Sequence, residues 1–317
     1  MSVPAITVFA PAGVPEVEPG TDLAAMVLAA VAGDPLGPLQ AGDVVVVTSK
    51  VVSKADGLVR AAGQRDAVIE EQTERTVARR GPTRIVRTHH GLTLAAAGVD
   101  SSNVAPEVLL VLPGDPDARA AELHRDLTDR TGLPLAVVLS DTAGRAWRIG
   151  QTDHAIGAAG LRVLERYAGR QDAYGNDLQV TAMAVADEIA GAADLAKGKL
   201  AGRPVAVLRG LGHLLDDSTG PDGRAADLQR PTEQDMFARG TRESVLMAVL
   251  VATGQGDRYE EVVALEEPDR SAAVLAGAVR AGTALLPEAA ELLSAVLAAA
   301  NGEPPPPGPS MHPGQPG

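Results

Sequence analysis

Hydrophobic residues are grouped along the chain in short continuous runs that predict buried strands. Runs rich in valine and leucine, which are typical of strands buried on both faces, lie at residues 43–48, 108–112, 135–140 and 205–210. A further short strand is predicted at residues 5–9. Strands without polar positions need other elements over both faces, so these runs predict a sheet inside the protein.

Amphipathic helices are predicted where apolar residues recur every three or four positions, at residues 22–32, 66–80, 117–131, 179–197, 241–254 and 271–300. The segment 179–197 begins as a strand and continues as an Ala-rich helix. The helix at 117–131 is preceded by a capping aspartate, Asp115 or Asp117, and is ended by Gly132. Because strands and helices do not alternate as βαβ units, their order predicts an α+β fold rather than a doubly wound sheet.

The composition excludes several classes of protein. The chain has no cysteine, which excludes disulfides, thiolate metal ligands and a cysteine nucleophile. Its N-terminal segment lacks the pattern of a signal peptide, and no apolar run reaches the ~18 residues of a membrane span. The net charge of −13 comes without a basic stripe. We therefore expect a cytoplasmic protein that binds neither membranes nor nucleic acid.

Lysine is unusually rare in this chain. Arginine and lysine together number 28, and only four of these residues are lysines, Lys50, Lys54, Lys197 and Lys199. A solvated surface accepts arginine equally well, whereas a compact ammonium suits point contact with phosphate. The two close pairs therefore indicate phosphate binding, with chance placement on the surface as the alternative. Neither of the two common glycine-rich phosphate loops occurs in the chain.

Polar segments follow the predicted strands, at points where loops carry function. The first, residues 48–57, combines hydroxyl groups with Lys50 and Lys54, and it suits either phosphate binding or an ordinary strand end. The second, residues 97–103, places Asp100 among Gly, Ser and Asn residues. This composition suits either a turn or a hard metal ligand.

The polar segment at residues 140–154 contains more candidate catalytic and metal-binding residues than the other segments. Asp141 and Thr142 offer oxygen ligands of the kind that Mg²⁺ or Mn²⁺ prefers. Arg145 and Arg148 can meet a carboxylate or a phosphate, although a surface loop held by salt bridges would show the same composition. Acidic metal ligands and cations for phosphate are together the groups that phosphoryl transfer needs.

These segments resemble the coenzyme F420-0:γ-glutamyl ligase family, in which F420 denotes a deazaflavin coenzyme. The likeness is to the actinobacterial type of the family and covers roughly residues 5–240. Ungapped matching runs carry it, at residues 42–57, 96–103, 140–161, 167–199 and 204–210. The residues after 240 are too few for the C-terminal nitroreductase-like domain of some relatives, so we expect the ligase region alone.

The resemblance implies an enzyme that uses GTP to join L-glutamate to F420-0 or to its dehydro form. The lactyl carboxylate is expected to become an acyl phosphate, which the glutamate amine attacks with release of GDP and phosphate. Further glutamates are then added through γ-linkages. The family implies Mg²⁺ or Mn²⁺, two ions per site, together with K⁺. Its fold implies mixed, largely antiparallel sheets with flanking helices, assembled as an intertwined homodimer.

The resemblance also assigns roles to residues that match the family's motifs. The implied metal ligands are Asp100, Asp141 and Thr142, and the implied catalytic residues are Asp141, Arg145 and Arg148. Contacts with GTP are expected from Val14, Pro15, Glu16, Val17, Ser49, Lys50, Lys54, Asn103, Lys197, Gly198 and Lys199. Some relatives carry an acidic metal ligand at the last of these positions. A protonated lysine cannot bind a metal, so either a different group completes the shell of the second metal or Lys199 itself contacts phosphate. Actinobacterial-type members also carry Lys-Gly-Lys here, which favours contact with phosphate.

The resemblance and the composition together predict three regions. Residues 1–240 are expected to form the catalytic region in two subdomains, and residues 241–301 a helical C-terminal extension. Residues 302–317 are rich in Pro and Gly, which predicts a disordered tail.

Two other functions are compatible with these segments. One is a non-catalytic protein that binds a nucleotide or a deazaflavin without transferring phosphate. The other is a related amide ligase that acts on another acceptor, because the shape of the acceptor pocket cannot be derived from the sequence. The acidic residues favour catalysis, since binding alone does not require them.

Overall fold

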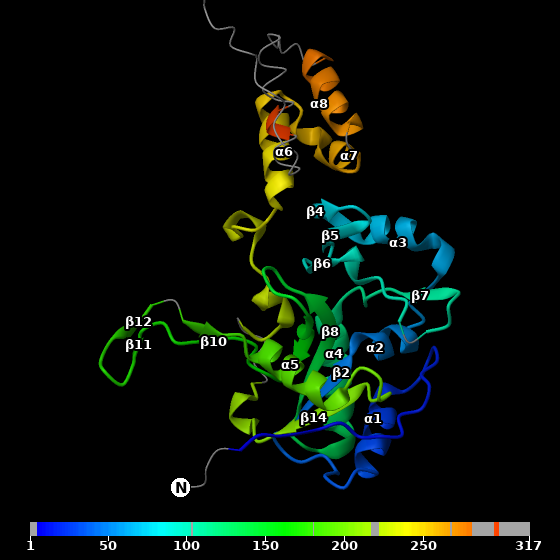
Figure 1. Ribbon diagram of the computed structural model, residues 1–317. Coiled ribbons are helices and arrows are strands. Elements are labelled where there is room, and N and C mark those ends of the chain that lie inside the picture. Colours follow the sequence, from blue (N-terminus) through cyan, green and yellow to red (C-terminus); the bar gives the residue numbers. More distant parts are fainter. Residues whose placement is uncertain are drawn as a thin grey trace, which may run out of the picture. The chain divides into compact units, whose positions relative to one another are not determined.

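The computed structural model describes residues 5–102, 104–179, 181–216, 222–266, 268–280 and 295–297 (Figure 1). The chain divides into two compact units. The first consists of Met1–Gln72 and Thr88–Arg230, and the second consists of Thr73–Arg87 and Pro231–Gly317. Residues 73–87 interrupt the first unit in the sequence and therefore belong to the same unit as the C-terminal part.

The first unit is built, within its described residues, on a five-stranded sheet. Its strands run in the order β1 (Thr7–Phe9), β14 (Val205–Arg209), β2 (Val44–Thr48), β8 (Ala136–Gly144) and β9 (Gln151–Ala159). Neighbouring strands are antiparallel except β2 and β8, which are parallel. The prediction of an α+β fold with largely antiparallel sheets and flanking helices is thus confirmed. The homodimer stays a prediction.

Helices cover both faces of this sheet, as the valine-rich runs predict (Figure 1). One face is covered by α1 (Leu23–Ala32), α2 (Ser49–Ala55) and α4 (Pro116–Thr131), and the other by α5 (Val185–Lys197). Side chains of β2 alternate between the two cores, with Val45 and Val47 in the first and Val44 and Val46 in the second. All four valines are fully buried, so β2 stabilises both layers.

Local sequence signals set both ends of α4. The Asp115 carboxylate accepts the backbone N–H of Ala118 at 2.9 Å and so caps the first turn. Gly132 ends the helix with a left-handed backbone, φ 66°, which favours glycine. The predicted helix at residues 117–131 is confirmed, with Asp115 rather than Asp117 as its cap.

Shorter elements surround this sandwich in the first unit. They are β3 (Val59–Ala61), α3 (Arg65–Gln72), β6 (Thr93–Ala95) and β7 (Val108–Leu110), with the 3₁₀ helices η1 (Ala62–Gln64), η2 (Ala96–Gly98), η3 (Gly212–Leu214) and η4 (Ala225–Leu228). An arm extends away from the sheet (Figure 1). It is formed by two short antiparallel pairs, β10 (Glu165–Arg166) with β13 (Ala182–Met183) and β11 (Arg170–Gln171) with β12 (Asp177–Leu178).

The second unit has a core of its own, which includes Leu246, Leu250, Val262 and Val274. Its elements are β4 (Thr73–Arg80), β5 (Thr83–Thr88), η5 (Thr232–Gln234), α6 (Thr241–Ala252), η6 (Gly256–Arg258), α7 (Tyr259–Val263) and α8 (Asp269–Arg280). The predicted helix at residues 241–254 is therefore present as α6. The predicted helix at residues 271–300 begins as α8, and most of its remainder, like the predicted tail, lies outside the described residues.

Two segments differ from the prediction. The predicted helix at residues 66–80 is wrong in its second half, because α3 ends at Gln72 and β4 follows directly. The charged local pattern of this segment favours a helix, but the segment also contains β-branched residues, which favour a strand. Its backbone groups form hydrogen bonds with β5 across the turn at Gly81, and this pairing stabilises the strand. The predicted strand at residues 135–140 continues as far as Gly144, into a segment that was expected to be a loop.

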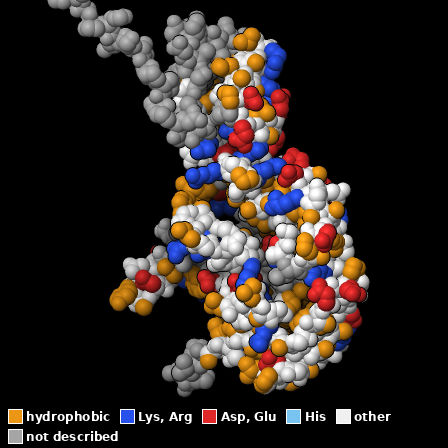
Figure 2. All heavy atoms as spheres, turned by 45° about the vertical axis from the view of Figure 1, so that its right-hand side comes forward, with side chains coloured by type: hydrophobic (Ala, Val, Ile, Leu, Met, Phe, Trp, Pro, Cys, Tyr) orange, Lys and Arg blue, Asp and Glu red, His pale blue; other side chains and the backbone are white. Residues whose placement is uncertain are grey.

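The surface of the protein mixes charged and apolar groups. On the face that Figure 2 shows, acidic and basic side chains are interspersed with hydrophobic ones. Trp147 and Ile149 are exposed in the loop between β8 and β9. Within the described residues, no helix combines the length and the apolar character that crossing a membrane requires.

Candidate active site

The ends of β2 and β8 bring two of the predicted segments together. Parallel strands finish at the same edge of a sheet, and Thr48 at the end of β2 lies beside Ser140 of β8. Helix α2 begins directly after Thr48, so Ser49 and Lys50 stand at this edge. The polar segment after β2 and the polar segment that begins at Ser140 therefore meet, although about 90 residues separate them in the sequence.

The last residues of β8 alternate between the two faces of the sheet. In the pairing with β9, Asp141 lies opposite His154 and Thr142 lies opposite Asp153. Ser140 and Thr142 project toward the α5 face, and their hydroxyls donate to the Asp153 carboxylate at 2.8 and 2.7 Å. Successive side chains of a strand point in opposite directions, so Asp141 projects toward the other face. Two residues expected to bind metal together thus face different surroundings.

All four lysines line one cavity of ≈ 420 Å³, which we call the lysine cavity. It lies beside the end of β2, the end of α5 and the loop at residues 14–17. Of the expected GTP contacts it gathers Val14, Pro15, Glu16, Val17, Lys50, Lys54, Lys197, Gly198 and Lys199. Ser49 is not among its lining residues, and Asn103 lies outside the described residues.

Lys197 is the most firmly held cation of the lysine cavity. It is 4% exposed, and its ammonium donates to Asp153 at 2.6 Å and to Ser140 at 2.9 Å. Burial would raise the pKa of Asp153, but the charge and the hydrogen bond of Lys197 outweigh burial and lower that pKa. A buried pair whose atoms are satisfied in this way holds the ammonium in one position.

Lys54 and Lys199 are held less tightly. Lys54 forms an ion pair with Glu16, which is exposed, and Lys199 donates to the Thr142 hydroxyl at 3.3 Å. An exposed ion pair stabilises a protein by only about 0–1 kcal/mol. An incoming phosphate can therefore replace these partners at little cost.

Sequence reasoning missed Asp153, the partner of Lys197. The residue fell inside a polar segment that was expected to be a loop. The signal that could have found it is Gly150, a turn residue between two segments compatible with strands. Such a hairpin places Asp153 opposite Thr142 and therefore beside the lysines.

Two expected metal ligands, Asp100 and Asp141, are held by consecutive residues of α2. The Ser49 hydroxyl donates to Asp141 at 2.8 Å, and the Lys50 ammonium pairs with Asp100 at 2.6 Å. Burial raises the pKa of Asp141 to about 6, and the negative charge of Asp100 adds to this effect. Burial acts on Asp100 in the same direction, but the hydrogen bond from Lys50 helps to lower its pKa below the ordinary value.

The chemistry of this donor set fits a hard divalent cation. The raised pKa of Asp141 results mainly from burial, so a cation bound beside it would stabilise the ionised carboxylate. Mg²⁺ commonly takes one or two carboxylates and completes its shell with water and substrate phosphates. Among the described residues, no three His, Asp or Glu side chains converge as a metal site. Asp100 and Asp141 stay predicted metal ligands, as does Thr142, whose hydroxyl donates to Asp153 in this structure.

The loop between β8 and β9 carries the two arginines that were expected in catalysis. Arg145 donates to the Gly150 carbonyl at 3.4 Å, and Arg148 is exposed. Neither residue lines the lysine cavity or the two cavities described next. The structure does not bring them to Asp141, and their catalytic role stays a prediction.

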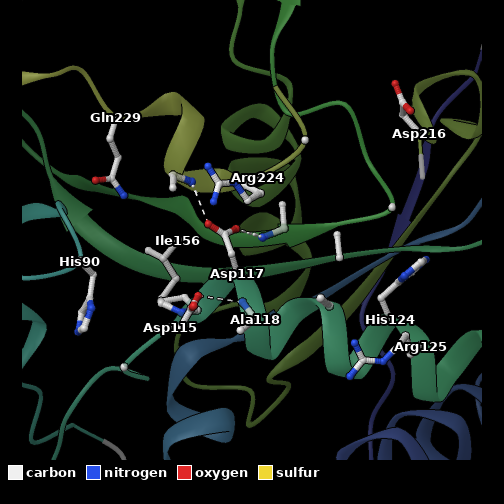
Figure 3. Close-up of a pocket in the computed structure, with 18 of the residues that line it drawn as sticks. His90, Asp115, Asp117, Ala118, His124, Arg125, Ile156, Asp216, Arg224 and Gln229 are labelled. Carbon is white, nitrogen blue, oxygen red and sulfur yellow. Dashed lines mark hydrogen bonds between the residues drawn. The ribbon is translucent and has the colours of Figure 1, made fainter. Parts of the chain in front are cut away.

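Two further cavities lie along β9, the edge strand of the sheet. The smaller one, the inner cavity, has ≈ 160 Å³. Its polar lining residues are Thr93, Asp141, His154, Asp187 and Gln229, and the others are apolar. The larger one, the α4 cavity, has ≈ 750 Å³ and is shown in Figure 3. The two cavities share three lining residues, Leu92, Ile156 and Gln229.

A family model and several coenzyme F420:L-glutamate ligases match most of this chain. The model of the family F420-0:Gamma-glutamyl ligase matches residues 13–210. The coenzyme F420:L-glutamate ligase of Methanothermobacter thermautotrophicus is 36% identical over 249 residues, which cover 71% of this chain and 96% of the relative. The enzyme of the same name from Methanopyrus kandleri is 35% identical over 242 residues, which cover 70% of this chain and 93% of the relative.

A third relative gives the same result. The coenzyme F420:L-glutamate ligase of Archaeoglobus fulgidus is 34% identical over 255 residues, which cover 74% of this chain and 97% of the relative. These similarities do not separate the subtypes of the family, so the actinobacterial type stays a prediction. Together with the match to the family model, they show that this chain belongs to the F420-0:gamma-glutamyl ligase family.

Proposed function

We propose that this protein is a GTP-dependent ligase that adds L-glutamate to coenzyme F420-0, first at the lactyl carboxylate and then through γ-linkages. One observation carries the proposal. The only four lysines of the chain, from two segments far apart in the sequence, line a single cavity, and one of them, Lys50, pairs with Asp100 at 2.6 Å. Family membership supports the ligase activity and the coenzyme as its substrate.

The reaction has two steps in this proposal. A carboxylate oxygen of the acceptor attacks the γ-phosphorus of GTP, the bond to the bridging oxygen breaks, and GDP leaves. The glutamate amine then attacks the acyl carbon, and a C–N bond replaces the C–O bond to phosphate. Inorganic phosphate leaves, and the proton of the amine passes to solvent. Most of the catalysis in phosphoryl transfer comes from positioning and charge stabilisation, so cations and fixed donors are the groups required.

The residues of the lysine cavity have distinct tasks in this scheme. Lys54 and Lys199 exchange their weak partners for phosphate oxygens, whereas Lys197 supplies a positive charge fixed by Asp153. Asp100 and Asp141 hold Mg²⁺ or Mn²⁺, which offsets the charge of the phosphates when it is bound. K⁺ and a homodimer belong to the proposal as further requirements of activity.

The test is a reaction of the purified protein with F420-0, L-glutamate, GTP, Mn²⁺ and K⁺, followed by mass spectrometry. We expect products heavier by one glutamyl unit at a time, one GDP per unit added, and less product with ATP or with Na⁺ in place of K⁺. Tight nucleotide binding without any mass increment would instead indicate a non-catalytic binding protein. An increment on another carboxylate acceptor, but none on F420-0, would indicate a related amide ligase.

A further inference from the structure

The α4 cavity is the largest of the three cavities described above, and the reaction scheme has not used it. It lies between the exposed side of α4, the strand β9 and the turn at η4 (Figure 3). Much of its lining consists of small or apolar side chains, among them Ala118, Ala121, Ala158 and Ile156. Large pockets with apolar walls and a few polar groups are typical of small-molecule sites.

The acidic groups of this cavity are already engaged. Asp115 caps α4, and Asp216 pairs with Arg162 at 3.8 Å. Asp117 accepts three backbone N–H groups, as Figure 3 shows in part. The guanidinium of Arg125, by contrast, has no hydrogen-bond or ion-pair partner among the described residues. Within the described residues, the cavity therefore offers one unpaired guanidinium and apolar surface, which suits a ligand with an acidic group and an apolar body.

The cavity also leads toward the reacting groups. Leu92, Ile156 and Gln229 line both the α4 cavity and the inner cavity, and the inner cavity reaches Asp141. Figure 3 shows Gln229 and His90 at one end of the α4 cavity and His124 and Arg125 at the other end. A long ligand in this cavity would thus lie with one end toward Asp141 and the other end beside Arg125.

We propose that the deazaflavin acceptor of the ligase reaction binds in the α4 cavity, with its reactive carboxylate passing through the inner cavity to Asp141. This inference rests on the proposed function. One face of the flat aromatic ring lies on the alanine-rich wall, and Arg125 pairs with an acidic group of the acceptor. GTP occupies the lysine cavity at the opposite side of the β8 end, so the two substrates approach the reacting carboxylate from different directions.

Asp117 positions the wall of this acceptor site. One of its oxygens accepts the N–H of Ala158 in β9 at 2.9 Å and the N–H of Ala225 in η4 at 2.8 Å, and the other accepts the N–H of Ala226 at 3.1 Å. The carboxylate thereby joins α4, β9 and η4. Ala225 lines the inner cavity and Ala226 lines the α4 cavity, so one side chain fixes the shape of both.

The first test fills the cavity with a larger side chain. Ala121→Phe places an aromatic ring in the α4 cavity, and we expect the KM for F420-0 to rise about tenfold or more while the KM for GTP changes less than about twofold. Asp129→Phe on the same helix is the matched control, because Asp129 is exposed and does not line the cavity. Equal KM values for F420-0 in both variants and the wild type would overturn the inference.

A second test does not depend on packing. Arg125→Gln keeps an exposed polar side chain on α4 and removes its charge, so we expect folding to be unchanged and the Kd for F420-0 to rise about tenfold. Calorimetric titration with F420-0 in the absence of GTP measures this Kd directly. A wild-type protein that makes no glutamylated product would refute the proposed function. An active wild type whose acceptor Kd is unaffected by Arg125→Gln and Ala121→Phe would refute only the acceptor site.

Discussion

The two sides of the β8 end differ in how their charges are compensated. On the α5 side, Lys197 is buried with Asp153 as its partner, and every oxygen of that carboxylate accepts a hydrogen bond. On the other side, Asp141 receives one hydrogen bond from Ser49 and has a pKa raised to about 6. One side is thus complete without a ligand, whereas the other has a carboxylate that a cation would stabilise. The difference supports the proposed role of Asp141 in binding a cation and a structural role for Asp153.

The largest expected effect comes from removing the carboxylate of Asp141, which in its ionised form has no cation as an ion-pair partner among the described residues. Asp141→Ala should lower the rate of glutamyl addition about a thousandfold or more, because a metal held there offsets charge that develops during phosphoryl transfer. The measurement is the initial rate of product formation, followed by mass spectrometry. A variant that keeps full turnover would remove Asp141 from the mechanism.

Removing the charge of Asp153, the partner of Lys197, should lower the stability of the protein instead. Asp153→Asn leaves a buried ammonium without a counter-charge, and we expect a loss of about 3–5 kcal/mol in the free energy of unfolding. Urea unfolding measures this loss. The control is the double variant Asp153→Asn with Lys197→Met, which removes both charges and should recover much of the stability. If the single and double variants unfold alike, Lys197 does not depend on Asp153.

The pH dependence of the stability of the metal-free protein is a second test of Asp141. Its pKa is higher in the folded state than the ordinary 3.8, so the folded protein binds this proton more tightly than the unfolded chain does. Stability contributed by the protonated carboxyl is therefore lost as the pH rises from about 4 to about 6. Asp141→Asn imitates the protonated form, and at pH 7 it should be more stable than the wild type by on the order of 1–3 kcal/mol.

Thermal unfolding at pH 4 and pH 7 without divalent cations distinguishes this effect from a general one. The two proteins should unfold at similar temperatures at pH 4 and at different temperatures at pH 7. Added Mn²⁺ should then stabilise the wild type more than Asp141→Asn. A variant that is less stable than the wild type at pH 7 would contradict the raised pKa.

The smallest effect is expected at the exposed edge of the lysine cavity. Glu16→Gln removes the surface partner of Lys54, so the free energy of unfolding should change by less than about 1 kcal/mol. The Kd for GTP should fall by no more than a few-fold, because the freed ammonium no longer exchanges partners. Glu18→Gln in the same loop is the control, since no ion pair joins its side chain to Lys54. A weaker affinity for GTP would mean that Glu16 itself contacts the nucleotide.

Much of the fold follows from local patterns in the sequence. The valine-rich runs became β2, β8 and β14, and the capping residues around α4 set its ends as expected. The segment after Gln72 did not follow its charged local pattern, because pairing with β5 satisfies its backbone. Local propensity is a weak guide where a partner strand is available.

The candidate site was only partly predictable. The rarity of lysine singled out the four residues that line the lysine cavity, and the compact ammonium gave a physical reason to expect phosphate. The sequence predicted candidate functional residues at residues 140–154, but it predicted a loop for this segment. As a hairpin, it directs neighbouring side chains to opposite faces, which a loop assignment cannot reveal.

The sequence by itself therefore determined most of the strands and helices, the candidate residues for the chemistry, and the family to which the chain is similar. The tertiary structure decided which of those residues meet. It separated Asp141 from Thr142, paired Lys197 with Asp153, and left Arg145 outside the cavities described. The physical reason is that the direction of a side chain depends on strand register and pairing. Register is set by contacts between residues far apart in the chain, and spacing along the sequence does not contain it.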